Sequence, residues 1–146
     1  MSTKFAFWRR WLVVVTLCFM AFSLCMVLAP HYTRRFFSWL IYASPEAINA
    51  FGGAAVAYIS LVHAVLGAVM FGWGVALLFI TLGPFKRMSS QAWQTLAVSM
   101  AAWFIPDTAY SLWSGFWQNG AFNLVFIILF AIPLAATHRL CRLQDR

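Results

Sequence analysis

The position of Asp107 marks it as the acidic residue that indicates a site, because it lies within an otherwise apolar and aromatic run. The run reads WFIPDTAYSLW over residues 103–113, and Pro106 comes directly before the aspartate. An ionisable group at membrane depth is costly, so it indicates a functional site or a structural hydrogen bond. The first question is therefore which other polar side chains could reach it.

His63 and Asn123 are predicted to lie at the same depth as Asp107. Counted from the basic ends of their helices at 1.5 Å per residue, His63 lies about 28 Å in, and Asp107 and Asn123 each lie about 24 Å in. A serine or an asparagine shares a helix face with each of them, three or four residues away. The candidate ligand-binding cluster consists of Ser60, His63, Asp107, Ser111, Asn119 and Asn123.

Two interpretations of this cluster stay open. In the first, His63 or Asn123 satisfies Asp107, and the cluster only joins helices, through bonds worth about 0.6 to 2 kcal/mol each. Asp107 could equally cap the turn after Pro106. In the second, the cluster lines a chamber for a small amphipathic molecule, such as a quinone or a lipid headgroup, in which Asp107 and His63 exchange a proton.

No cofactor or metal is predicted, although three cofactors can be weighed. Haem needs axial ligands on facing helices, whereas His31 and His63 belong near one surface and His138 near the other. A quinone would use the polar cluster, and a carotenoid would use the 15 phenylalanines and eight tryptophans. Copper binding by Cys18 and Cys25, seven residues apart, competes with ordinary helix packing.

Catalytic groups of the common kinds are not recognisable in the sequence. The acidic residues are Glu46, Asp107 and Asp145, which form no carboxylate pair. There is also no nucleophile beside a base and no glycine loop for phosphate. We therefore expect a protein that is not an enzyme, with the question left open.

The elements that must position these residues are membrane-spanning helices. Apolar residues make up 64% of the 146 residues, and the mean hydropathy is +0.83. Four apolar runs are long enough to cross a hydrocarbon core about 30 Å thick. We predict an all-α integral membrane four-helix bundle that forms a single domain over residues 1–146. The spans cover about residues 11–29, 54–82, 91–114 and 121–140.

Residues 31–44, between the first two spans, are predicted to form an interfacial helix. They combine Arg34 and Arg35 with many aromatic side chains, a composition that suits the headgroup boundary. Ser44 is expected to cap a short helix, which ends at a break over Gly52 and Gly53.

The ends of the other helices are predicted from glycine and proline. Pro30 stops the first span, Gly83–Pro84 ends the second by glycine's C-terminal geometry, and Asn119–Gly120 makes the turn between the third and fourth. Pro106 and Pro133 are expected to bend the third and fourth spans.

Basic residues determine the predicted orientation. The segments assigned to the inside hold eight Lys or Arg residues, namely Lys4, Arg9, Arg10, Lys86, Arg87, Arg139, Arg142 and Arg146. The segments assigned to the outside hold Arg34 and Arg35. Both termini are therefore predicted to be cytoplasmic in an inner (plasma) membrane. Because the net charge of +7 flanks the apolar runs, it indicates the lipid bilayer and not nucleic acid.

Small residues recur at every fourth position of the second span. The ladder consists of Ala64, Ala68, Gly72 and Ala76, with Gly67 and Gly74 alongside. Such a ladder permits close approach of a neighbouring helix, either within the chain or in a homo-oligomer or membrane-complex partner.

Several stretches resemble a known group of proteins. HAVLGAVMFGWGVALL, GPFKR, WFIPDTAYSLWSGFWQNGAFNLVF and AIPLAATHR, within residues 58–139, look like small bacterial four-span proteins that are loosely similar to DoxX-like membrane proteins. The resemblance implies a four-helix bundle, sometimes a membrane subunit of a quinone-linked oxidoreductase. It supplies no established catalytic residue. It draws attention to Pro106, Asp107, Ser111, Gly115 and Asn123.

The sequence favours a structural or accessory subunit that packs with partner helices. The alternative is a quinone- or lipid-binding subunit of an oxidoreductase, or a small-molecule carrier, that uses the polar cluster.

Overall fold

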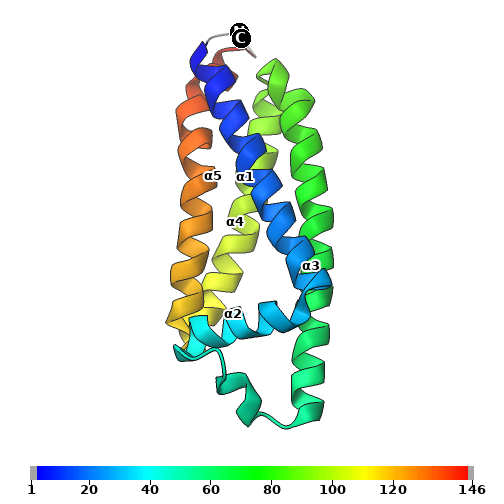
Figure 1. Cartoon of the computed structure of the whole chain (residues 1–146). Helices are drawn as coiled ribbons and strands as arrows, with labels where there is room; N and C mark the ends of the chain where they lie inside the picture. Colours follow the sequence, from blue (N-terminus) through cyan, green and yellow to red (C-terminus); the bar gives the residue numbers. More distant parts are fainter. Residues whose placement is uncertain (1–2, 145–146) are drawn as a thin grey trace. The chain divides into compact units, whose positions relative to one another are not determined.

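The structure, a computed structural model, describes residues 3–144, and all its regular elements in that range are helical. Asp145 and Arg146, which were counted among the charged residues above, lie outside the described residues. The all-α prediction is confirmed for residues 3–144. In chain order the elements are α1 (Thr3–Leu28), α2 (Pro30–Tyr42), η1 (Ala47–Ala50), α3 (Gly53–Leu82), η2 (Pro84–Arg87), α4 (Ser90–Trp113) and α5 (Trp117–Gln144) (Figure 1).

Three segments within residues 3–144 are long and apolar enough to cross a membrane. They are Thr3–Leu28, Gly53–Arg87 and Trp117–Arg142. The fourth predicted span coincides with α4, whose 24 residues would measure about 36 Å. Its apolar run is interrupted by Pro106 and Asp107, so α4 has the length for a crossing but a lower hydropathy than the other three.

The helices pack as two compact units. Unit 1 comprises Met1–Leu17 and Ala76–Arg146, and unit 2 comprises Cys18–Val75. Unit 1 therefore contains the start of α1, the end of α3, and α4 and α5. Unit 2 contains the end of α1, then α2, η1 and most of α3.

One face of α1 is buried at spacings of seven, four and three residues, which keep to a heptad period. This 3.5-residue repeat is the pattern by which one helix packs along another over several turns. The buried side chains are Phe5, Leu12, Thr16, Phe19, Ser23 and Met26.

Within unit 2, α1 packs against two glycines of α3. A Cβ atom on Gly67 would lie 2.7 Å from both the Cβ of Met26 and the carbonyl oxygen of Ser23. A Cβ atom on Gly74 would lie 2.5 Å from the Cγ of Met20. At Gly67 the backbone of α1 itself is in the way of a larger residue, which is the usual reason for glycine at a helix contact, whereas at Gly74 the side chain of Met20 would have to move.

A single residue, Ala29, separates the end of α1 from the start of α2. Pro30 occupies its first turn, where the missing N–H costs nothing, so this proline begins a helix as well as ending the previous one. The hydroxyl of Thr33 donates to the carbonyl oxygen of Cys25 at 3.2 Å, which links α2 back to α1. Within unit 2, Figure 1 shows α2 running across the direction of α3.

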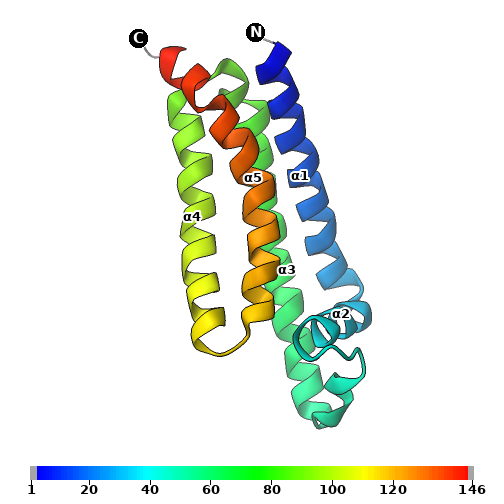
Figure 2. The same cartoon turned by 90° about the vertical axis from the view of Figure 1, so that its left-hand side faces the viewer.

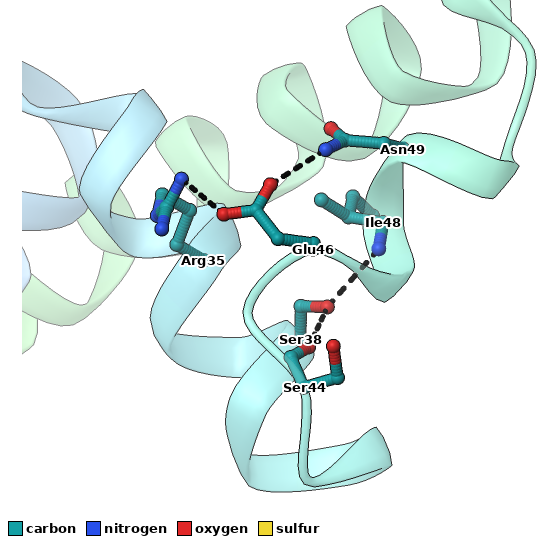
Figure 3. A network of polar contacts seen from close by, with 6 residues as sticks. All are labelled: Arg35, Ser38, Ser44, Glu46, Ile48 and Asn49. Atoms are coloured by element: carbon teal, nitrogen blue, oxygen red, sulfur yellow. Dashed lines mark hydrogen bonds and ion pairs between the residues drawn. The ribbon is translucent and has the colours of Figure 1, made fainter.

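A serine of α2 organises the connection to η1, and the predicted cap at Ser44 is wrong. The hydroxyl of Ser38 donates to the carbonyl oxygen of Ser44 at 2.7 Å and accepts from the backbone N–H of Ile48 at 3.1 Å (Figure 3). The hydroxyl of Ser38 in α2 therefore accepts a backbone N–H at the start of η1. Glu46, which occupies the N-cap position, makes no side-chain cap bond. The break at Gly52–Gly53 is confirmed, because α3 begins at Gly53.

The same connection carries an ion pair. Arg35 contacts Glu46 at 2.5 Å, and the Nδ2 of Asn49 donates to the other carboxylate oxygen of Glu46 at 2.7 Å (Figure 3). The charge of Arg35 is thus matched within unit 2.

The end of α3 falls where it was predicted, but by different backbone geometry. α3 ends at Leu82, and Pro84 begins η2. Gly83 has a φ of −93°, so the left-handed glycine geometry expected there is wrong. The left-handed residue of this connection is Met88, with a φ of 58°, which follows η2.

The turn between α4 and α5 lies earlier than predicted. Gly115 has a φ of +85°. Its N–H donates to the carbonyl oxygen of Leu112 at 3.2 Å, and the N–H of Phe116 donates to the carbonyl oxygen of Ser111 at 2.8 Å. This pair of bonds is the Schellman ending, which needs a left-handed residue and so favours glycine. The predicted turn at Asn119–Gly120 is wrong, because both residues belong to the first turns of α5. Figure 2 shows α4 and α5 side by side in opposite directions.

Two tryptophans hold the carbonyl groups of α5 around its internal proline. Pro133 has no N–H, so the carbonyl of Leu129 loses its usual helical donor. The indole N–H of Trp11 donates to that carbonyl at 3.0 Å, and the indole N–H of Trp93 donates to that of Leu134 at 2.7 Å. The helix continues through Pro133 with the freed carbonyl satisfied by α1.

Candidate functional site

A polar cluster joins the ends of α4 and α5 next to the Gly115 turn. The Nδ2 of Asn119 donates to the Oδ1 of Asp107 at 3.1 Å and to the Oγ of Ser111 at 2.8 Å. The hydroxyl of Ser111 lies 2.8 Å from the carbonyl oxygen of Asp107 and 3.3 Å from its Oδ1. Ser111 is buried, while Asp107 and Asn119 are half-buried.

The local fold explains why these three residues meet. Asp107 and Ser111 are four residues apart and share one face of α4. Because the turn is completed by Phe116, Asn119 falls in the first turn of α5 and points back to that face. The earlier turn is thus what brings the amide to the carboxylate.

A second polar contact lies further along the same helix pair. The Nδ2 of Asn123 lies 3.4 Å from the Oγ1 of Thr108, and Asn123 is only 3% exposed. Sequence reasoning did not select Thr108. Its spacing of three residues from Ser111, which places both on one face of the helix, was the available signal.

Chemically, the α4–α5 cluster resembles a satisfied interhelical network. One oxygen of Asp107 has two donor groups within reach, and the amide of Asn119 bridges two acceptors. Such bonds align two helices. They also hold the carboxylate in one orientation.

Ser60 and His63 have their own partners in unit 2. The Nη1 of Arg34 donates to the Oγ of Ser60 at 2.6 Å. The ring of His63 stacks on that of Phe37, with centroids 4.7 Å apart and planes 20° apart. The predicted meeting of His63 with Asp107 stays a prediction.

Arg34 and Phe37 were not selected as site residues. They are three residues apart on α2, as Ser60 and His63 are on α3, so the two pairs form adjacent contacts between the same helices. The helical spacing was visible in the sequence, but the helix that each pair faces was not.

The predicted small-residue ladder lies mostly on an open face of α3. Ala68, Gly72 and Ala76 are exposed, Ala64 is half-buried, and a Cβ on Gly72 would meet nothing within 4 Å. Packing within the chain uses Gly67 and Gly74 instead. A neighbouring helix on the ladder stays a prediction.

A separate cavity of about 170 Å³ lies in unit 1, between the start of α4 and the end of α5. The ring of His138 lies 4.7 Å from that of Trp93, centroid to centroid. The residues that line the cavity are Ser90, Trp93, Gln94, His138, Cys141 and Arg142. Across the described part of the chain, no group of three or more His, Cys, Asp or Glu side chains could hold a metal ion.

The resemblance to DoxX-like membrane proteins rests on the stretches between residues 58 and 139 quoted above. It stays a prediction. No protein-family model, curated protein or solved structure matches the chain.

Proposed function

We propose that the chain is a four-span inner-membrane protein, with spans formed by α1, α3, α4 and α5 and with both termini in the cytoplasm. Three of these helices have the length and hydropathy of a span, and α4 has the length. Its hydrogen bonds to α5 would satisfy the polar side chains that lower its hydropathy. The α2 helix would lie at the outer interface, with Tyr32, Trp39 and Tyr42 exposed.

Within that membrane setting, the role is structural. The protein acts as a non-enzymatic accessory subunit that packs with partner helices, and its polar cluster holds α4 to α5. One observation carries this proposal: the Asp107 carboxylate, the costliest group of α4 in a bilayer, is engaged by Ser111 and Asn119 of the same hairpin. A quinone-binding subunit or a carrier would instead need that carboxylate for its ligand.

The structural role predicts coupled losses of stability. Asp107→Ala and Asn119→Ala should each lower the free energy of unfolding by about 1 kcal/mol, as interhelical hydrogen bonds in membranes do. The double variant should lose less than the sum, because both changes remove the same bond. Reversible unfolding in mixed micelles measures all three. Ser114→Ala is the matched control, because its hydroxyl bonds only to carbonyl groups of its own helix.

The rival function gives a different result with Asp107→Asn. This change keeps the size of the side chain and one acceptor oxygen but removes the charge. Saturable quenching of tryptophan fluorescence by a soluble quinone analogue reports binding. If Asp107→Asn stays as stable as the native protein and abolishes saturable quenching that the native protein shows, the structural role is overturned.

A further inference from the structure

Arg34 is a half-buried cation without a matching anion. Its guanidinium donates one hydrogen bond, to the neutral hydroxyl of Ser60, and forms no ion pair within residues 3–144. Its neighbour Arg35 pairs with Glu46. Because a guanidinium stays charged in proteins and carries five N–H donors, Arg34 retains most of its binding capacity.

His63 adds a second unsatisfied group in the same place. It follows Ser60 by three residues on α3, and its ring lies against Phe37, which follows Arg34 by three residues on α2. Its Nδ1 is buried and has no hydrogen-bond partner among the described residues. A buried polar atom without a partner is costly, so a ligand that forms a hydrogen bond to it would gain affinity.

Two contacts between α2 and α3 hold Arg34 and His63 in place. The Oγ of Ser60 donates to the carbonyl of Val56 at 2.7 Å, which leaves its lone pairs to receive Arg34. Phe37 fixes the plane of the His63 ring. Ser60 and Phe37 are therefore positioning residues, and Arg34 and His63 are the groups with capacity for a ligand.

The required ligand is an anion with several oxygen atoms. A phosphate group matches the planar fork of a guanidinium and can accept a further bond from an imidazole N–H. A neutral quinone would leave the charge of Arg34 unmatched. The aromatic residues exposed on α2 suit the depth at which phospholipid phosphates lie.

We propose that Arg34 and His63, positioned by Ser60 and Phe37, bind the phosphate of an anionic phospholipid headgroup at the junction of α2 and α3. This site goes beyond the structural role proposed above and does not depend on the Asp107 cluster. The α2 helix would thereby be held at the membrane surface by a lipid as well as by its own contacts.

The test measures retention of phosphatidylglycerol by the purified full-length protein, using native mass spectrometry and thermal stability in detergent. Arg34→Gln should weaken binding on the order of tenfold, because a charge-assisted hydrogen bond is lost. Arg35→Gln makes the same charge change on the same helix, where the guanidinium is already paired with Glu46, and should retain the lipid. Equal losses from both variants would overturn the site, because they would show only general attraction of charge.

Further arms identify the source of the phosphate and guard against misfolding. Phosphatidylglycerol should stabilise the protein more than phosphatidylcholine does, and inorganic phosphate should not reproduce the effect. Stabilisation by inorganic phosphate alone would overturn the lipid assignment. If Arg34→Gln does not fold, His63→Phe, which keeps a ring against Phe37 but removes Nδ1, should still weaken lipid retention. Unchanged retention in that variant would overturn the role of His63.

Discussion

At the scale of single residues, the chain repeatedly uses a side chain to satisfy a backbone group that has lost its partner. Ser38 accepts the N–H of Ile48 at the start of η1. Trp11 donates to the carbonyl of Leu129, which Pro133 deprives of its helical donor. An unsatisfied backbone group is costly in a bilayer, so in the proposed span α5 the indole of Trp11 should contribute more than its packing alone.

Trp11→Phe tests this compensation. The change keeps an aromatic ring but removes the indole donor, and should lower the free energy of unfolding by about 1 kcal/mol. Trp8→Phe is the matched control, since Trp8 makes no hydrogen bond within the described chain. In a Pro133→Ala background, the restored N–H can bond to Leu129, so Trp11→Phe should cost less. Equal costs in both backgrounds, measured by unfolding in mixed micelles, would contradict the compensation.

At the scale of the elements, contact between α1 and α3 in unit 2 depends on two glycines seven residues apart. Gly67 and Gly74 lie against α1, whereas Gly72 has open space where a Cβ would stand. One helix therefore carries two small-residue faces. One is used within the chain, and the other is available to a neighbouring helix.

Gly67→Ala and Gly72→Ala should separate these two faces. At Gly67 the added methyl would meet the backbone of Ser23 and the Cβ of Met26, so the helices must move apart at a cost of about 1 to 3 kcal/mol. At Gly72 the same change should leave the stability of the isolated chain unchanged. The free energy of unfolding, measured in mixed micelles, compares the two variants. Equal destabilisation by Gly67→Ala and Gly72→Ala would contradict the assignment of faces.

A bulkier residue at Gly72 tests the partner face. Gly72→Leu should leave the fold intact, because its side chain points into open space, but should block a helix docked on the ladder. Cross-linking in native membranes measures the association. If Gly72→Leu leaves every cross-linked species unchanged, the ladder carries no partner helix.

At the scale of the whole molecule, the proposed topology turns on α4. The basic residues Lys86 and Arg87 precede α4, and the Gly115 turn follows it. If α4 crosses the bilayer, these two connections lie on opposite sides. If it does not, they lie on the same side.

Reporter insertions distinguish the two topologies. Alkaline phosphatase inserted at Gly115 should be active, because the enzyme requires the periplasm, and the same insertion at Lys86 should be inactive. A fluorescent protein at the C-terminus should be bright, as expected for a cytoplasmic end. Equal phosphatase activity at Lys86 and Gly115 would exclude a crossing by α4.

The sequence by itself determined the helical class and most helix ends. Apolar runs predict helices of this length, and the breaks at Gly52–Gly53 and Gly83–Pro84 follow from local backbone preferences, which neighbouring residues express without help from distant ones. The turn at Asn119–Gly120 was mispredicted because Gly115 offers a competing left-handed position a few residues earlier. The sequence has a glycine at both places, and the sequence alone does not say which one takes the left-handed conformation.

Only the tertiary structure decided which polar and small residues meet. The sequence placed Ser60 and His63 on one helix face, but not that Arg34 and Phe37 of α2 would cover them. The sequence showed two sets of small residues on α3, but not that α1 would pack against Gly67 and Gly74. The physical reason is that spacing along a helix fixes which side chains share a face, whereas the partner of that face depends on the packing of segments far apart in the chain.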